Sequence, residues 1–431
     1  MSARTKFGIG FAYACAAVVA SVYILRGAFV PRLVDALKYG RGDCVINWLG
    51  ARAWISHVDP YSATGLKWAG ISVMGHPPTT PMWYLPFWRY DIFELSQIFG
   101  HLLVLMLLVH LVLVASELRL PQPLATALLG FALVMDTSWW VYHVQMVQLS
   151  EPIALLYVLA WICLRRHHDV ASGILLGLAC TMKLYAGLVL LLLVLGRRWR
   201  GVAAAAAVYL GFAVLATWHF GFACWYEYLP MLRSTQNAWL SSLKNASLHG
   251  VILRLWWRPG GPRGPALTSA TLLSWAIAIA IILAMAWLSR RALARKPTSV
   301  PGTVDESIDL PFALASTASV WLNPVVWEHY DVTLLFPMAV AIVAAWRVEG
   351  RRRIAWMAAT AVVLGFVVYL LSIDMYAKNQ AHTPRALVWY VTANWLPWPL
   401  VMGVLGALLW RRDRVDASAD AISAGAGARP A

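Results

Sequence analysis

The stretch "ASGILLGLACTMKLYAGLVLLLLVLG", residues 171–196, decides how the chain can be laid across a membrane. Basic clusters stand on both sides of it, "RRHH" at 165–168 and "RRWR" at 197–200, but the stretch itself has only 26 residues. Two full crossings of a bilayer need about 40 residues. We therefore predict a re-entrant or broken helical hairpin with Lys183 at its apex. Such a backbone is tolerated only where it is buried in protein or lines a cavity.

The composition of the whole chain also indicates a membrane protein. Of its 431 residues, 60% are hydrophobic and 13% are charged. Soluble domains carry about 25% charged residues, so an all-α integral membrane protein with many spans is predicted. The net charge of +15 would suggest nucleic acid in a soluble protein, but the Lys and Arg residues cluster in short loops between apolar segments. That pattern is typical of membrane orientation, so we expect a lipid bilayer as partner and no nucleic acid.

Ten candidate spans, each near the roughly 20 residues needed to cross, lie between the basic clusters. They cover 7–29, 92–115, 123–140, 147–164, 202–219, 267–289, 309–326, 331–346, 354–372 and 393–410. The positive-inside rule places all the basic clusters, and with them both termini, in the cytoplasm. The first apolar segment is longer than the ~7–15 residues of a signal-peptide core, so we expect it to be retained as a span.

A single transmembrane domain is predicted over 1–415, followed by a disordered cytoplasmic tail of small residues at 416–431. Three long segments, 30–91, 220–266 and 373–392, face outward in this topology. They hold many of the 24 tryptophans, which favours an aromatic belt at the interface or helices lying along the outer membrane surface. The five cysteines show no C-x-x-C spacing, so neither a disulfide framework nor a zinc site is predicted.

Ionisable residues of both signs gather on the outer side, although such groups are costly near a bilayer unless they face a partner or water. They include Asp43, His76, Glu151, Glu227, Arg233, Lys244, Glu328, His329 and Asp331, with Lys183 pointing toward them from the hairpin. Asp43, in "RGDCVINWLG", has two interpretations that its spacing leaves open. It is either a general base at the membrane surface or the N-cap of a helix that begins at Cys44.

The stretch "WLNPVVWEHYDVTLLFPM", residues 321–338, is unusual for a membrane interior. Glu328, His329 and Asp331 lie within four residues at the start of a predicted span. The acids suit the positive N-terminus of that helix. A histidine beside two acids in a cavity is equally well placed to handle a phosphate or a proton.

Two outer loops have structural and functional interpretations. In "SHVDPYS", 56–62, Asp59 precedes a proline, and Tyr61 is placed to anchor a turn at the interface. The four prolines of "GHPPTTPMWYLPFW", 75–88, forbid regular helix and favour an extended loop, either a rigid connector or a substrate-lining segment.

Expected signatures of metal and nucleotide binding are missing. No D-x-D or E-x-D occurs in the outer segments, so a carboxylate pair for a divalent metal is not evident. No Walker loop or G-x-G-x-x-G follows a strand, so neither ATP nor a dinucleotide is implicated. We expect no cofactor and a metal-independent site.

The order of these motifs resembles that of glycosyltransferase family 87, over about residues 10–410. The motifs run from the Asp-bearing outer loop ending in "DPY", through "HPPTTPMWYLPF" and the Lys-bearing hairpin before "RRWR", to "NASLHGV" and "NPVVWEHYDVTLLFP". Members are GT-C-fold enzymes and include actinobacterial polyprenol-phosphate-mannose-dependent α-mannosyltransferases and a related arabinofuranosyltransferase. The resemblance thus implies a GT-C-like helical bundle that transfers a sugar.

The resemblance also implies roles for individual residues. The family's catalytic base corresponds to Asp43, and the lysine of the hairpin corresponds to Lys183. The segment "WEHY" supplies Glu328 and His329, and "HPPT" places His76 where an aromatic residue is usual. Tyr330 stands where a second histidine often stands. These two departures leave the sugar and the acceptor open.

The expected reaction moves a sugar, mannose by resemblance, from a polyprenyl phosphate to a glycolipid or polysaccharide at the outer face of the plasma membrane, with inversion. Asp43 would act as general base and His329 would assist. The departing phosphate and the substrates would contact a second group of residues: Lys183, Glu328, His76, Tyr61, Arg233 and Lys244. Alternatives are an arabinofuranosyl or other hexosyl transferase of the same family, or a transporter of lipid-linked saccharides without enzyme activity.

Overall fold

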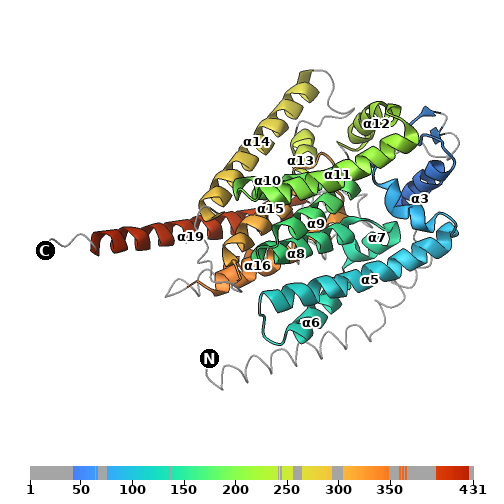
Figure 1. Ribbon diagram of the computed structural model, residues 1–431. Coiled ribbons are helices and arrows are strands. Elements are labelled where there is room, and N and C mark those ends of the chain that lie inside the picture. Colours follow the sequence, from blue (N-terminus) through green and yellow to red (C-terminus); the bar gives the residue numbers. More distant parts are fainter. Residues whose placement is uncertain are drawn as a thin grey trace, which may run out of the picture.

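The computed structural model describes residues 42–63, 65–66, 75–135, 137–240, 242, 245–255, 265–293, 304–348, 359–360, 362–363, 365 and 395–426. Every regular element within these ranges is a helix (Figure 1), which confirms the all-α class. The helices are α3 (Gly42–Ile55), η1 (Pro81–Phe87), α5 (Ile92–Glu117), α6 (Pro123–Met135), α7 (Ser138–Met146), α8 (Ser150–Arg165), α9 (Asp169–Met182), η2 (Leu184–Val189), α10 (Leu190–Leu195), α11 (Trp199–Phe220), α12 (Ala223–Leu240), α13 (Leu248–Leu255), α14 (Pro265–Leu293), η3 (Glu306–Ile308), α15 (Asp309–Trp321), η4 (Glu328–Leu334), α16 (Leu335–Trp346) and α19 (Pro397–Ala426).

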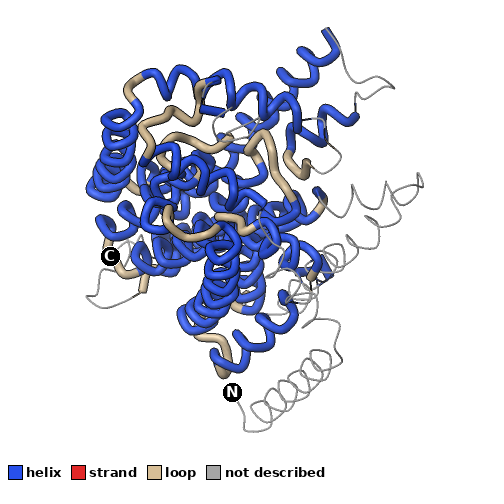
Figure 2. Tube along the Cα trace, turned by 90° about the vertical axis from the view of Figure 1, so that its right-hand side faces the viewer, coloured by secondary structure: helices blue, strands red, loops and turns tan. Residues whose placement is uncertain are grey.

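The helix α15 is the centre of the bundle. All of its residues from Asp309 to Trp321 are buried, and it packs against α19, η2, α16 and α14. The outer helices α11 and α14 instead expose large apolar side chains, such as Leu210 (59%) and Leu283 (64%). Apolar side chains at that exposure suit a lipid environment rather than water. The loops between the helices are mostly short (Figure 2).

The predicted hairpin at 171–196 is confirmed. The helix α9 ends at Met182, Lys183 is extended (φ −148°, ψ 128°), and the chain continues as η2 and α10. Asp169 at the start of α9 and Arg198 just after α10 form an ion pair of 2.6 Å. The chain after α10 has therefore returned to the end of the bundle at which α9 begins. Lys183 therefore lies at the far tip of a broken hairpin.

The hairpin is fixed in the bundle by close packing between α9 and α11. A Cβ atom built on Gly173 would lie 2.1 Å from the carbonyl oxygen of Gly201, so these two backbones approach in a way that only glycine permits. Small residues that allow such approach are the usual means by which helices associate in membranes. The apex with Lys183 is thus held by a rigid pair of helices.

The ten predicted spans are not confirmed within the residues that the structure describes. Four described helices are long and apolar enough to cross a membrane, Ile92–Glu117, Trp199–Phe220, Thr268–Leu293 and His329–Trp346, or up to five if the pair α6 and α7, bent by 80°, counts as one. Hydropathy marks an apolar segment but not the length of its helix: α15 has 13 residues, about 20 Å at 1.5 Å per residue, and cannot span alone. The predicted spans 7–29 and 354–372 lie outside the described residues.

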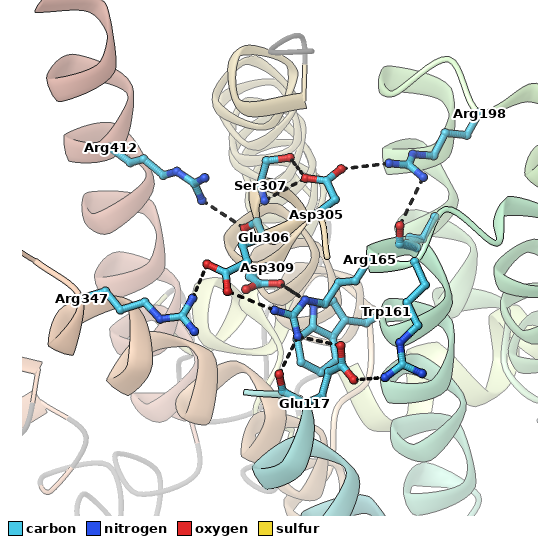
Figure 3. Close-up of polar contacts among 12 residues, drawn as sticks. Glu117, Trp161, Arg165, Arg198, Asp305, Glu306, Ser307, Asp309, Arg347 and Arg412 are labelled. Atoms are coloured by element: carbon cyan, nitrogen blue, oxygen red, sulfur yellow. Dashed lines mark hydrogen bonds and ion pairs between the residues drawn. The ribbon is translucent and has the colours of Figure 1, made fainter. Parts of the chain in front are cut away.

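Four basic clusters meet at one end of the bundle, which we call the arginine end and define by Arg165, Arg198, Arg347 and Arg412 (Figure 3). Arg165 is 2% exposed and pairs with Glu117 at 2.9 Å and with Asp309 at 3.1 Å. The shared location is the one that the positive-inside rule requires. Which side of the membrane this end faces stays a prediction.

The outer segments contain short helices, as expected for chain that lies along a membrane surface. Segment 30–91 holds α3 and η1, and segment 220–266 holds α12 and α13, whereas 373–392 lies outside the described residues. At the C-terminus, α19 continues to Ala426, into the segment for which composition predicts a disordered tail. That segment is rich in alanine, the strongest helix former.

Asn245 of the "NASLHGV" stretch joins two distant segments. Its side-chain oxygen accepts hydrogen bonds from the backbone N–H groups of Ser247 and Val326, and its amide donates to the carbonyl oxygens of Pro324 and Leu240. The side chain is fully buried. It therefore holds the loop before α13 against the chain that leads to η4.

Replacing Asn245 with alanine is expected to lower the free energy of unfolding by about 2–3 kcal/mol, because buried backbone groups lose their partners. Asn323→Ala is the matched control, since Asn323 makes one backbone hydrogen bond of this kind, to Val325. Unfolding of both variants in detergent, followed by circular dichroism, measures the difference. An equal effect of the two substitutions would contradict the role given to Asn245.

Candidate active site

The candidate site lies where five separate segments meet: the start of α3, the loop 75–80, the end of α7, the break after α9 and the helix η4. The residues that contact one another there are Asp43, Asn47, His76, Gln148, Lys183 and Tyr330. The helix α8 begins two residues after Gln148 and ends at Arg165. Its 16 residues place this site about 24 Å from the arginine end.

Asp43 is not the N-cap of its helix. The helix α3 begins at Gly42, so Asp43 lies in the first turn. Its carboxylate instead contacts a residue far away in the sequence: Oδ2 accepts a hydrogen bond of 2.6 Å from Nε2 of Gln148. The side chain keeps 28% of its surface exposed, so a substrate can reach the carboxylate.

His76 places a second acceptor beside Asp43. Its Nδ1–H donates to Oδ1 of Asn47 at 2.6 Å, which leaves the Nε2 lone pair facing Oδ2 of Asp43 at 3.8 Å. The pKa of His76 is lowered to about 4, mainly by burial, with the carboxylate of Asp43 opposing the shift and the ammonium group of Lys183 adding to it. At neutral pH the imidazole is uncharged, so two hydrogen-bond acceptors converge on one small region.

Lys183 is the buried cation of the site. It is 6% exposed, and its Nζ donates to the hydroxyl of Tyr330 at 2.8 Å and to Oε1 of Gln148 at 3.4 Å. The amide of Gln148 thus bridges Lys183 to the carboxylate of Asp43. A carboxylate and an ammonium group are held on opposite sides of one neutral side chain.

The break in the hairpin at Lys183 is stabilised by the loop 75–80. The hydroxyl of Thr79 donates to the carbonyl oxygen of Thr181 at 2.8 Å, and the hydroxyl of Thr80 donates to that of Met182 at 2.9 Å. Carbonyl groups at the end of a helix need partners where water is excluded. The loop therefore supplies both His76 to the site and the hydrogen bonds that let the helix end there.

His329 lies beside this network. Its ring stacks on that of Tyr330, with centroids 4.7 Å apart, and it is 2% exposed. His143 lies near it, with the two ring centroids 6.4 Å apart. Neither ring nitrogen of His329 has a hydrogen-bond partner within the described part of the chain. Such a buried polar group is available to a ligand.

The other predicted site residues have different positions. Tyr61 is buried against Cys224 and Tyr228, and its hydroxyl donates to the backbone carbonyl of His76 at 2.6 Å, so it supports the site from behind. Arg233 is exposed on α12, and no described contact joins it to Lys183. Glu328 begins η4, but its side chain, like all of Lys244, lies outside the described residues.

Sequence reasoning missed Gln148 and Asn47, which orient Asp43 and His76. Both are uncharged, whereas the prediction rested on ionisable groups. The signal that identifies Gln148 is an amide in the mostly apolar "MVQLS", at the start of the span predicted over 147–164. Among the described residues, no group of three or more His, Cys, Asp or Glu side chains is arranged to hold a metal ion. Metal independence stays a prediction.

Acidification is expected to destabilise the protein partly through His76. Because its pKa is about 4 when folded and about 6.5 when unfolded, the unfolded chain binds the extra proton between these values. Stability is therefore lost as the pH falls from 6.5 toward 4, by about 1–2 kcal/mol at pH 5. His76→Gln should lose less stability than the wild type between about pH 7.5 and 5. The control is His101→Gln, because His101 is exposed on α5; its stability should depend on pH as that of the wild type does. Thermal unfolding measured across this pH range tests the prediction. The same pH dependence in all three proteins would refute the lowered pKa of His76.

Comparison with known proteins identifies the family. The model of glycosyltransferase family 87 matches residues 76–304, more than half of the chain. The match contains His76, Gln148 and Lys183. Neither curated proteins nor solved structures gave a match. The matched region carries the loop, the hairpin and the bridging amide of the site just described, and the chain therefore belongs to glycosyltransferase family 87 and is a glycosyltransferase.

Proposed function

We propose that this enzyme moves a sugar, mannose by family resemblance, from a polyprenyl monophosphate to a hydroxyl of a glycolipid or polysaccharide. The observation that carries the proposal is the pairing of a partly exposed carboxylate, Asp43, with a buried ammonium group, Lys183, through Gln148. A carboxylate suits the removal of a proton from an attacking hydroxyl. An ammonium group suits the charge that develops on a departing phosphate.

The reaction is a single displacement at the anomeric carbon. The acceptor hydroxyl approaches between Oδ2 of Asp43 and Nε2 of His76, two acceptors 3.8 Å apart. Its oxygen forms the new glycosidic bond while the bond from the anomeric carbon to the phosphate oxygen breaks, and its proton passes to Asp43. The configuration inverts because attack and departure occur on opposite faces of the sugar.

Lys183 and His329 receive the departing phosphate. Nζ of Lys183 has three N–H donors, and Tyr330 and Gln148 accept two of them, which leaves one for a phosphate oxygen. His329, whose ring stacks on that of Tyr330, adds a ring N–H. A monophosphate leaving group with two such donors needs no metal for charge neutralisation, so we assign no metal a role. Glu328, Arg233 and Lys244 stay candidates for further substrate contacts.

The proposed location is the plasma membrane, with about ten spans in a GT-C-like bundle and both termini in the cytoplasm. The arginine end then faces the cytoplasm by the positive-inside rule. Asp43 and Lys183, at the other end of α8, face the outside. That placement suits a donor whose polyprenyl chain lies in lipid while its sugar enters an outer cavity.

The test is a transfer assay with the purified full-length protein in nanodiscs. Lipids that copurify are identified by mass spectrometry, and polyprenyl phosphates carrying mannose, arabinofuranose or glucose are then supplied as donors with a glycolipid acceptor. Transfer from one of them with inverted configuration, read by NMR of the product, supports the proposal. Transfer only from a nucleotide sugar refutes the donor class. Movement of intact donor between leaflets without transfer identifies a transporter instead.

A further inference from the structure

A cavity lies at the arginine end, away from the candidate active site. It has a volume of about 320 Å³ and is lined by residues of η3, α15, α16 and α19 and by the residues that follow α5 and α16. Figure 3 shows two of its arginines, Arg347 and Arg412, converging on Glu306. Since α8 separates the two ends of the bundle by about 24 Å, this cavity does not belong to the sugar-transfer site.

The cavity lies at the depth of lipid headgroups. Leu118 directly follows the candidate span Ile92–Glu117, and Arg347 directly follows the candidate span His329–Trp346; both line the cavity. Two apolar spans thus end at its mouth. In a bilayer this level is the boundary between hydrocarbon and headgroups.

The charges around the cavity leave a surplus of positive charge. The carboxylate of Glu306 pairs with Arg347 at 2.6 Å, and that of Asp309 pairs with Arg165 at 3.1 Å. Arg412 donates only to the backbone carbonyl of Glu306, at 3.1 Å. No described residue pairs with Arg411, which also lines the cavity. Among the described side chains, both acids are therefore neutralised by other arginines, and neither Arg411 nor Arg412 has an anionic partner.

The remaining wall of the cavity is apolar. Leu310, Val340, Val343 and Leu408 line it together with the arginines. A free phosphate or a nucleotide would leave this wall unused. A phospholipid headgroup uses both surfaces, because its phosphate meets the guanidinium groups while the first carbons of its acyl chains lie on the aliphatic side chains. Basic pockets between membrane helices are known to take such headgroups.

We propose that this cavity binds the headgroup of an anionic phospholipid, with the phosphate on Arg411 and Arg412 and the proximal acyl carbons on Val343 and Leu408. A zwitterionic headgroup brings a cation toward two uncompensated arginines and is disfavoured. The site would fix α19 to α15 and α16 at the membrane surface. This inference is independent of the sugar donor and acceptor proposed above.

Native mass spectrometry of the full-length wild-type protein tests the proposal first. The protein is titrated with phosphatidylglycerol, with phosphatidylcholine of the same acyl chains, and with inorganic phosphate. We expect phosphatidylglycerol to bind about tenfold more tightly than phosphatidylcholine. Equal binding of the two lipids would overturn the role of the arginines. If inorganic phosphate binds as tightly as phosphatidylglycerol, the apolar wall adds nothing to binding, and its proposed role is overturned.

A pair of double variants then locates the site. Arg411→Gln with Arg412→Gln is expected to lose about tenfold in affinity for phosphatidylglycerol. Arg119→Gln with Arg290→Gln removes the same charge from two exposed arginines that do not line the cavity and should bind as the wild type does. If the two double variants lose affinity equally, the lipid binds by general surface charge and the proposal fails. If the cavity variant does not fold, the apolar-to-acidic change Val343→Glu replaces it, with the same expected loss.

Discussion

Replacing Asp43 with asparagine is expected to lower kcat for sugar transfer by about 10²–10⁴-fold, the usual contribution of a general base. Asparagine has the same shape, and its oxygen can still accept the hydrogen bond from Gln148, which is 2.6 Å in the wild type. The fold and the binding of the donor should therefore persist. What is lost is the ability to take the proton from the acceptor hydroxyl. Initial rates of transfer at saturating donor, together with donor affinity, measure the two effects separately.

The matched control is Asp91→Asn. Asp91 is an exposed residue that caps α5 by accepting a hydrogen bond from the backbone N–H of Phe93, and asparagine caps helices equally well. This variant makes the same chemical change in the same outer segment and should retain wild-type activity. Transfer by Asp43→Asn within tenfold of the wild type would remove Asp43 from the role of base.

The hairpin was predictable because length and charge constrain it independently. Two basic clusters have to stay on one side of the membrane, and the residues between them are too few for two crossings. The number of spans was not predictable in the same way, because hydropathy does not say whether an apolar segment crosses or is enclosed by other helices. The helix α15 is the second case: it is mostly apolar, and every one of its 13 residues is buried inside the bundle.

The ionisable members of the site were identified from the sequence, and their connections were not. Asp43, His76 and Lys183 are conspicuous because charges and prolines are rare in apolar surroundings. Gln148 is inconspicuous, and it connects Asp43 to Lys183 only because α7 ends with Val147 in a left-handed conformation (φ 47°) that turns the next residue toward α3. A contact of this kind depends on tertiary geometry that no local pattern encodes.

Tyr330 shows how a departure from a family pattern can be explained by structure. In sequence it is a position where a histidine is more usual by family resemblance, and the departure leaves the sugar and the acceptor open. In the structure its hydroxyl is the nearest partner of Lys183, at 2.8 Å. The phenol keeps a buried ammonium group hydrogen-bonded in the absence of substrate without adding a second charge. The difference at Tyr330 is therefore compatible with the same chemistry.

Replacing Lys183 with methionine is expected to lower kcat/KM by about 10²–10³-fold, the loss typical when one donor to a developing anion is removed. Methionine has a similar length and fills the same space, so the packing at the hairpin apex changes little. The loss should appear in kcat and in the KM for the proposed polyprenyl-phosphate donor. The KM for the acceptor should not change, because the acceptor approaches on the side of Asp43. Steady-state kinetics with each substrate varied in turn tests this pattern.

A control is needed because Lys183 also forms part of the break in the hairpin. Thr181→Val is suitable, since Thr181 lies two residues away and its hydroxyl accepts a hydrogen bond from the indole N–H of Trp83 at 3.0 Å. Losing that bond should cost about 1 kcal/mol of stability with activity near that of the wild type. If Thr181→Val reduces transfer as strongly as Lys183→Met does, the effect at Lys183 comes from a disturbed hairpin. If Lys183→Met alone is inactive while both variants unfold at similar temperatures, the ammonium group acts on the leaving phosphate.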